Sequence, residues 1–267
     1  MTSTHVDFTR KDTLAVITLN RPEARNALTP DMVADLGQAI KDCARPEIRA
    51  VMLTGTAGSF CAGADVKDFV ENLEEGGPEG LSQHLHNLAD SLHRNIIMGI
   101  RQLEKPVIAA VNGVAAGAGF SLALCCDLRV ASSDARFIMA YAGIGCTADG
   151  GSTYMLPRLV GLSKAMEIYM ARQPIGAEYA RELGLVNQVC PSEGFERHAL
   201  EMATQLAQGP TLAYGRVKTL FDNSWAAGLE EQLDAETEAI SKIVFTGDFQ
   251  EGVKAFTQKR MPWFQGR

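Results

Sequence analysis

Apolar residues along the chain form short β-rich runs that alternate with longer stretches of helical spacing. The runs predict five strands, at 14–19, 49–54, 106–111, 128–131 and 185–189. The stretches between them predict helices at about 30–43, 81–103, 118–125, 152–160, 163–171, 176–183 and 193–208. Thr29 and Pro30 are typical of an N-cap and a first helical residue. This alternation predicts an α/β fold, with stacked sheets and helices outside them.

The pattern changes after about residue 210. No further strand is predicted, and helices fit at 211–224, 228–245 and 249–260. We therefore divide the chain into a main domain at 1–209 and a helical C-terminal region at 210–267. Three helices alone cannot form a good core. We expect this region to pack on the main body or on a neighbouring subunit, where it would serve oligomerisation or cover the active site.

One internal segment has a composition unlike its surroundings. Residues 71–80 are acidic and rich in glycine. Such a composition favours a solvated, mobile surface loop over a buried element.

Composition and charge exclude several classes of protein. Apolar residues make up 46% and charged residues 21%, as in ordinary globular domains. The net charge of −7 disfavours nucleic-acid binding. No apolar run reaches 18 residues, so we expect no membrane span, and the polar N-terminus lacks the apolar core of a secretory signal. The spacing of six cysteines and five histidines predicts no metal site, and we expect reduced cysteines in a cytoplasmic protein.

Two segments rich in small residues each follow a predicted strand, at 58–67 and 112–121. Small side chains let a ligand approach the backbone, and free N–H groups at a helix start favour negative charge. Two such N–H groups converging on one oxygen would form an oxyanion hole. Close packing of strand against helix explains small residues equally well. The second segment fits neither a dinucleotide fingerprint nor a phosphate loop.

Four stretches of the sequence together resemble the crotonase (enoyl-CoA hydratase/isomerase) superfamily. They are Leu19–Leu28, Phe60–Asp65, Lys105–Gly113 and Phe256–Phe264, so the resemblance runs from end to end of the chain. It implies a crotonase-like ββα spiral of stacked sheets with outer helices, plus a helical C-terminal region. It also implies an acyl-CoA thioester substrate, with coenzyme A arriving as part of that substrate and not as a permanent cofactor. A homotrimer or a hexamer is implied as well.

The resemblance also assigns roles to individual positions. The N–H groups of Ala64 and Ala118 would hold the thioester oxygen as it becomes an enolate, and losing one such donor typically costs about 3 kcal/mol of barrier. The positions that correspond to coenzyme contacts are Arg25, Ala27, Ala62, Asp65, Lys67 and Lys259. Lys259 would reach the coenzyme phosphates, and could do so in a neighbouring subunit. For the cations among them, an ordinary solvated side chain is the alternative.

The sequence departs from the hydratases of this family at two places. Where those enzymes have two glutamates, this chain has Ser121 and Tyr141. Hydration needs an acid and a base aimed at adjacent carbons, so a standard hydratase is disfavoured. Asp149, just before a Gly-Gly pair, resembles the single carboxylate of the enoyl-CoA isomerases. One carboxylate is enough for a 1,3-proton shift through an enolate, so we predict an isomerase in which Asp149 is the base and Tyr141 and Ser121 assist.

Other interpretations stay open. Asp149 could cap the following helix or form an Asp-Gly turn, Ser121 could be a packing residue, and Tyr141 a core aromatic. The run from Tyr141 to Asp149 is also similar to aryl-CoA dehalogenases, which need a histidine base, and His93 lies one position off that match. Other hydrolase or lyase chemistry of the superfamily, an enoyl-CoA hydratase and a non-catalytic CoA-ester binder are the remaining alternatives.

Overall fold

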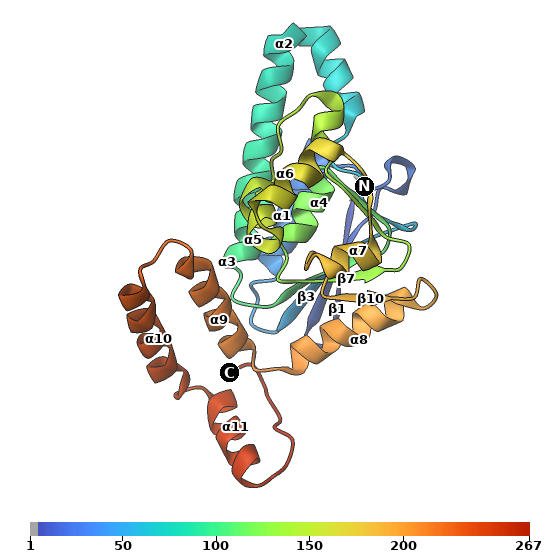
Figure 1. The fold of residues 1–267 in the computed structure, drawn as a ribbon. Helices are drawn as coiled ribbons and strands as arrows, with labels where there is room; N and C mark the ends of the chain where they lie inside the picture. Colours follow the sequence, from blue (N-terminus) through green and yellow to red (C-terminus); the bar gives the residue numbers. More distant parts are fainter. Residues whose placement is uncertain (1–4) are drawn as a thin grey trace.

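The computed structural model describes residues 5–267 and arranges the strands in two sheets (Figure 1). The larger sheet consists, in spatial order, of β1 (Val6–Lys11), β2 (Leu14–Leu19), β3 (Ala50–Gly55), β5 (Val107–Val111), β7 (Leu128–Ser132) and β10 (Gln188–Cys190). Only β1 is antiparallel to its neighbour. The smaller sheet consists of β4 (Ser59–Cys61), β6 (Val114–Ala116), β8 (Arg136–Ile138) and β9 (Ile175–Gly176).

The body repeats one structural unit three times. A strand of the larger sheet passes directly into a short strand of the smaller one, as β3 into β4, β5 into β6, and β7 into β8. A helix follows each pair in the chain: α2 (Val66–Ser91), α4 (Ala118–Cys125) and, after the 3-10 turn η3 (Ala140–Ile144), α5 (Ser152–Val160). The predicted α/β fold class is therefore confirmed, in the form of a repeating ββα unit.

Helices cover both faces of the larger sheet. Alternate strand residues point to opposite faces: Ala15, Ile17 and Leu53 belong to the core cluster that includes α1 (Pro30–Asp42). Their neighbours Val16 and Met52 pack instead against α8 (Phe195–Gln208). The remaining elements of the body are η1 (Pro22–Ala24), the π-helical turn η2 (Leu92–Ile97), α3 (Met98–Gln102), α6 (Leu162–Ala171) and α7 (Ala177–Glu182). Burial on both faces explains why the inner strands of the larger sheet have continuous apolar sequences.

The prediction of a mobile surface loop at 71–80 is wrong. These residues belong to α2, which rises from the body and returns to it at the top of Figure 1. The helix is interrupted at Gly77, whose φ of 63° and ψ of −165° lie outside the helical region, directly before Pro78. Glycine and proline therefore break a single turn, while the glutamates on either side continue the helix.

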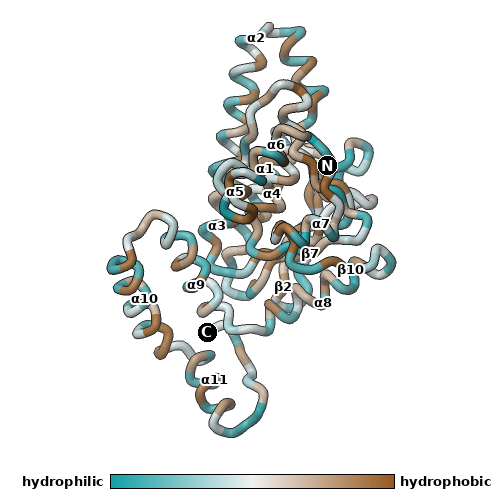
Figure 2. The backbone as a smooth tube through the Cα atoms, viewed as in Figure 1, coloured by the Kyte–Doolittle hydropathy of each residue, from teal (hydrophilic) through white to brown (hydrophobic). Residues whose placement is uncertain are grey.

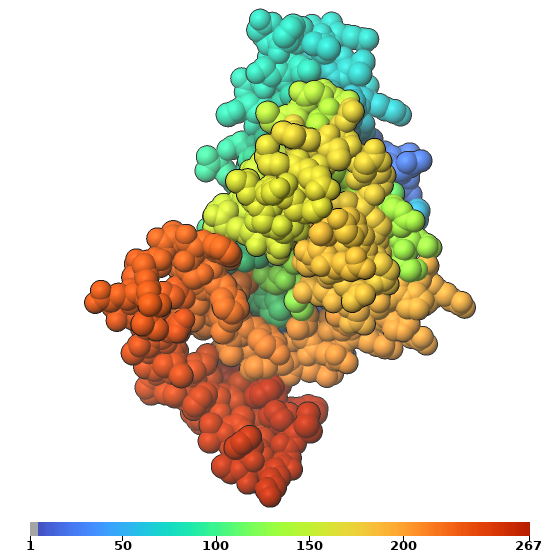
Figure 3. All heavy atoms as spheres, viewed as in Figure 1, coloured from blue at the N-terminus to red at the C-terminus, as the bar shows by residue number. Residues whose placement is uncertain are grey.

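Three helices follow the body, as predicted, and within the described residues no strand follows Cys190. They are α9 (Thr211–Ser224), α10 (Leu229–Ile243) and α11 (Gly247–Thr257), and they form a lobe that projects from the body (Figure 3). Arg49 of the body connects to this lobe by hydrogen bonds, because its guanidinium donates to the carbonyl oxygens of Gly209 (2.6 Å) and Phe264 (3.0 Å). Whether residues 210–267 form a separate domain stays a prediction.

Much of the C-terminal lobe is apolar and exposed. No residue of α10 is buried, and apolar stretches lie along the tube of α10 and α11 (Figure 2). Phe245 and Phe256 are each 83% exposed. Across residues 5–267, no helix combines the length and hydropathy needed to cross a bilayer.

Candidate active site

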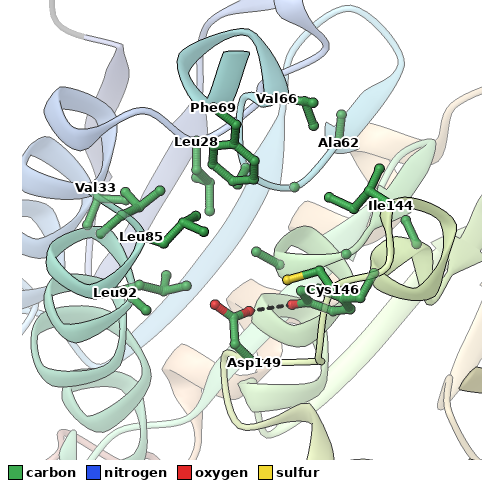
Figure 4. A pocket seen from close by; sticks show the side chains of 18 residues that line it. Leu28, Val33, Ala62, Val66, Phe69, Leu85, Leu92, Ile144, Cys146 and Asp149 are labelled. Atoms are coloured by element: carbon green, nitrogen blue, oxygen red, sulfur yellow. Dashed lines mark hydrogen bonds between the residues drawn. The ribbon is translucent and has the colours of Figure 1, made fainter. Parts of the chain in front are cut away.

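A cavity of about 140 Å3 lies between α2, η3 and the start of α4 (Figure 4). Most of its wall is apolar, formed by Leu28, Val33, Val66, Phe69, Leu85, Leu88, Leu92 and Ile144. Both small-residue segments reach it, through Ala62–Ala64 and Gly117–Ala118. Among the described residues that line the cavity, Asp149 is the one carboxylate. The structure therefore brings the two segments and the predicted acid to one place.

Glycine is required where the two small-residue segments touch. Gly63 has a φ of +96°, and a Cβ there would lie 2.8 Å from the carbonyl oxygen of Ala116 and 3.4 Å from the amide nitrogen of Ala118. Gly117 also has a positive φ, of +50°. Only glycine accepts both the conformation and the contact, so the two backbones meet directly at the cavity wall.

Among the residues that the structure describes, none offers a backbone acceptor to the amide of Ala64 or of Ala118. Ala64 pairs with Leu28 in an isolated parallel bridge, in which Leu28 N–H donates to Gly63 O (2.7 Å) and Asp65 N–H to Leu28 O (3.0 Å). These bonds use the neighbours of Ala64, so its own N–H faces away from the bridge. Ala118 is the first residue of α4, where an amide has no intrahelical partner. Two free donors thus stand at the cavity wall.

Ser121, Tyr141 and Asp149 form a chain of hydrogen bonds, in which Tyr141 and Asp149 line the cavity and Ser121 is buried outside its lining. The Tyr141 hydroxyl donates to Asp149 Oδ1 (2.5 Å) and lies 2.9 Å from Ser121 Oγ. Burial, and after it the negative charge of Asp149, raise the pKa of Tyr141 far above its ordinary value. The phenol therefore stays protonated, and because its proton points at Asp149, Tyr141 can only accept from Ser121, whose hydroxyl proton is shared with the Gly117 carbonyl oxygen at 3.3 Å. In Figure 4, the dashed line marks the bond to Asp149, whose other oxygen points away from it.

Asp149 does not cap α5 with its side chain. Its backbone carbonyl accepts bonds from the N–H (3.1 Å) and hydroxyl (2.8 Å) of Ser152, which leaves the carboxylate free to face the cavity. Gly150 is held at a φ of +59°, and a Cβ there would lie 2.7 Å from the Cβ of Ser121. The Gly150 N–H donates to Nε2 of His93 (3.0 Å), and the same Nε2 lies 4.0 Å from Asp149 Oδ2. The Asp-Gly turn thus serves to aim the carboxylate.

The positions predicted to meet coenzyme A differ in burial and in their distance from the cavity. Ala62 lines the cavity, Ala27 is buried, and Arg25 and Lys67 are exposed. Lys259 follows α11, at the far end of the molecule from α2 (Figure 1). Within one chain the structure therefore does not bring Lys259 to the cavity. Contacts of these residues with a coenzyme stay predictions.

Asp65 has a structural role that the sequence did not reveal. Its carboxylate is buried, pairs with Arg21 Nη1 (2.6 Å) and caps α2 by accepting the Lys67 N–H (3.0 Å). Burial alone would raise the pKa of Asp65, but the bonds from Arg21 and from the Lys67 amide outweigh it and lower that pKa below its ordinary value. This ion pair ties the loop after β2 to the start of α2, beside the cavity.

We expect Asp65→Asn to destabilise the fold by about 2–3 kcal/mol at pH 7, since it removes the buried partner of the Arg21 cation and leaves only the exposed Glu23, at 3.6 Å. The folded-state pKa of Asp65 is depressed, so its contribution is present above the unfolded-state value near 3.9 and is lost as the pH falls through the folded-state pKa. Urea unfolding at pH 7 and at successively lower pH measures this. The parent and Asp65→Asn should converge on acidification, and a gap that persists would contradict the assignment.

Three features of the site were not predicted from the sequence. They are the Arg21–Asp65 ion pair, the bond between His93 and Gly150, and the apolar wall that α1 and α2 supply. The wall residues Leu85 and Leu88 of α2 and Leu92, the first residue of η2, recur at helical spacing. That spacing was a signal for an apolar face, although it could not say what the face contacts.

Known proteins similar to this chain share its family and its fold. The enoyl-CoA hydratase/isomerase family profile matches residues 9–267. A probable enoyl-CoA hydratase of Rhodobacter capsulatus is 41% identical, with 95% of each chain covered, and a 1,2-epoxyphenylacetyl-CoA isomerase of Escherichia coli is 37% identical, with 94% of each covered. The crystal structure of an enoyl-CoA hydratase from Polaromonas sp. JS666 superposes with a TM-score of 0.90 at 37% identity, covering 97% of this chain and 99% of that one. The crotonase-like fold is thereby confirmed, and the chain belongs to the enoyl-CoA hydratase/isomerase family.

Proposed function

We propose that this protein is an enoyl-CoA isomerase, which moves a carbon–carbon double bond of an acyl-CoA by forming an enolate and shuttling one proton. One observation carries the proposal: a single carboxylate lines the cavity among the described residues, with one oxygen held by Tyr141 and the other without a donor. A lone carboxylate can remove a proton from one carbon and return it to another.

In the proposed mechanism, the thioester carbonyl oxygen lies between the N–H groups of Ala64 and Ala118. These donors strengthen their bonds as the oxygen gains the charge of the enolate. Oδ2 of Asp149 takes the proton, while Tyr141 keeps Oδ1 in place. The acyl chain occupies the apolar wall, and coenzyme A, which enters as part of the substrate, extends toward the surface cations Arg25 and Lys67.

Hydratase activity is the main alternative, because relatives with that name are similar to this chain. Addition of water needs a second acid or base beside Asp149. The two further polar side chains on the hydrogen-bond chain, Ser121 and Tyr141, are both uncharged, and the raised pKa of Tyr141 keeps its proton in place. This favours proton shuttling over hydration.

Incubation of the enzyme with 3-enoyl-CoA and 2-enoyl-CoA in deuterated water tests the proposal. We expect double-bond migration and incorporation of deuterium into the acyl chain, followed by mass spectrometry. Rapid formation of 3-hydroxyacyl-CoA would identify a hydratase instead. Binding of acyl-CoA without any exchange of substrate protons would identify a non-catalytic CoA-ester binder.

A second candidate uses Asp149 as a nucleophile, as in the aryl-CoA dehalogenases. The observation in its favour is the position of His93, whose Nε2 lies 4.0 Å from Asp149 Oδ2. In the sequence, this histidine lies one residue away from the position that corresponds to the dehalogenase histidine. His93 lies in the π-helical turn η2, where the wider i→i+5 spacing changes the direction of the side chains relative to a regular helix. Release of halide from 4-halobenzoyl-CoA would favour this candidate.

We also propose that the chain works as a homotrimer or a hexamer. Large apolar side chains on the C-terminal lobe, such as Phe221 at 68% and Leu229 at 76% exposure, support this, because exposed apolar surface on this scale often marks a contact with another chain. Light scattering after size exclusion should give three or six times the chain mass of 28.8 kDa. The two substitutions Phe245→Asp and Phe256→Asp, made together, should lower the measured mass. A parent that is monomeric at micromolar concentration would contradict the proposal.

A further inference from the structure

His93 contacts the loop on which Asp149 lies, although the two residues belong to segments that are distant in the sequence. It lies in the π-helical turn η2, and its Nε2 accepts the Gly150 N–H at 3.0 Å. A neutral imidazole that accepts at Nε2 carries its proton on Nδ1. The contact therefore specifies one of the two neutral tautomers of His93.

The tautomer matters because the same nitrogen faces the proposed base. Nε2 of His93 lies 4.0 Å from Asp149 Oδ2, and Oδ1 of that carboxylate already accepts the proton of Tyr141. With its lone pair directed at the Gly150 N–H, Nε2 offers Oδ2 no donor. Among the described residues, no side chain or amide donates a hydrogen bond to Oδ2, which is thus the oxygen able to receive a proton.

We propose that His93 is a positioning residue for Asp149. In its Nδ1–H form it fixes the peptide between Asp149 and Gly150, which sets the direction of the carboxylate, and it leaves Oδ2 free to accept the substrate proton. This inference rests on the proposed isomerase function. Glycine adopts the positive φ at position 150 without strain, and a Cβ there would lie 2.7 Å from the Cβ of Ser121, so the bond from the Gly150 N–H to His93 acts on a backbone that no side chain of its own holds in place.

Substitutions at position 93 separate positioning from simple packing. Glutamine can place an acceptor oxygen near the position of Nε2, whereas leucine keeps the bulk and loses the acceptor. We expect His93→Leu to lower kcat about tenfold, as for one lost hydrogen bond, with KM changed less than about twofold. His93→Gln should restore kcat to within about twofold of the parent. His86→Leu, on an exposed position of α2, is the matched control and should behave as the parent.

A second measurement does not depend on activity. Nitrogen-15 NMR of the imidazoles, with the His93 signal assigned by its loss in His93→Gln, should show the Nδ1–H tautomer. An Nε2–H tautomer, or an equal loss of kcat in His93→Leu and His93→Gln, would overturn the inference. If the parent moved no substrate proton, the proposed isomerase function would fail, and with it the catalytic role of His93, while the tautomer would still report on the hydrogen bond itself.

Discussion

Asp149→Asn will lower the rate of double-bond migration by roughly 10³-fold, within the range that a positioned general base usually contributes. Asparagine has nearly the same shape as aspartate, and its carbonyl oxygen can still accept the Tyr141 hydroxyl that now bonds Oδ1 at 2.5 Å. What is lost is an oxygen basic enough to receive a proton. Deuterium uptake from the solvent and migration of the double bond should fall together, because both depend on the same enolate.

The control for Asp149→Asn must remove a negative charge elsewhere. Asp12 lies exposed in the turn between β1 and β2, so Asp12→Asn changes the net charge equally, outside the cavity lining and outside the lobe proposed to contact another chain. It should keep parental activity. Equal thermal stability of both variants would exclude unfolding as the cause of the loss. Turnover by Asp149→Asn at the parental rate would remove the proposed base, and the mechanism with it.

The strands β2, β3, β5 and β7 of the larger sheet could be predicted from sequence because they are buried on both faces, whereas the strand predicted at 185–189 overlaps the partly exposed β10 only at 188–189. Strands buried on both faces appear as apolar runs of five or six residues, as at Val107–Val111. The strands of the smaller sheet have two or three residues, too few to show a period of two. The edge strand Val6–Lys11 was missed for another reason, since most of its residues are exposed and polar.

Whether a feature of the site could be predicted depends on whether its residues are close together or far apart in the sequence. In the proposed mechanism Ala64 and Ala118 act through the backbone, so their side chains carry no chemical signal, and only the resemblance to a known family pointed to them. Arg21 pairs with Asp65 across 44 positions of the chain, and His93 meets Gly150 across 57. Such contacts depend on the tertiary structure, and no local sequence pattern predicts them. Tyr141 and Asp149, eight positions apart, meet within one turn-rich segment and could be predicted together.

Ala118→Pro should lower kcat by roughly 10²–10³-fold while the fold persists, because it deletes one proposed oxyanion donor. A backbone N–H can be removed only by proline, and Ala118 is the first residue of α4, the helical position that proline tolerates best. Gly117 before it has a ψ of −123°, away from the helical region that a following proline disfavours.

The proline ring also takes up room beside the cavity, so the loss of kcat has to be separated from a loss of binding. Affinity for acyl-CoA, measured by titration, should change far less than kcat if the donor acts mainly on the enolate, since the charge on the oxygen develops only during the reaction. The matched control is Leu162→Pro, which places proline at the first position of α6 after Gly161, on a side chain 70% exposed and outside the cavity. It should keep both affinity and kcat. Were Ala118→Pro to turn over as fast as Leu162→Pro, the amide of residue 118 would have no part in stabilising the enolate, and the carbonyl oxygen would have to be held elsewhere.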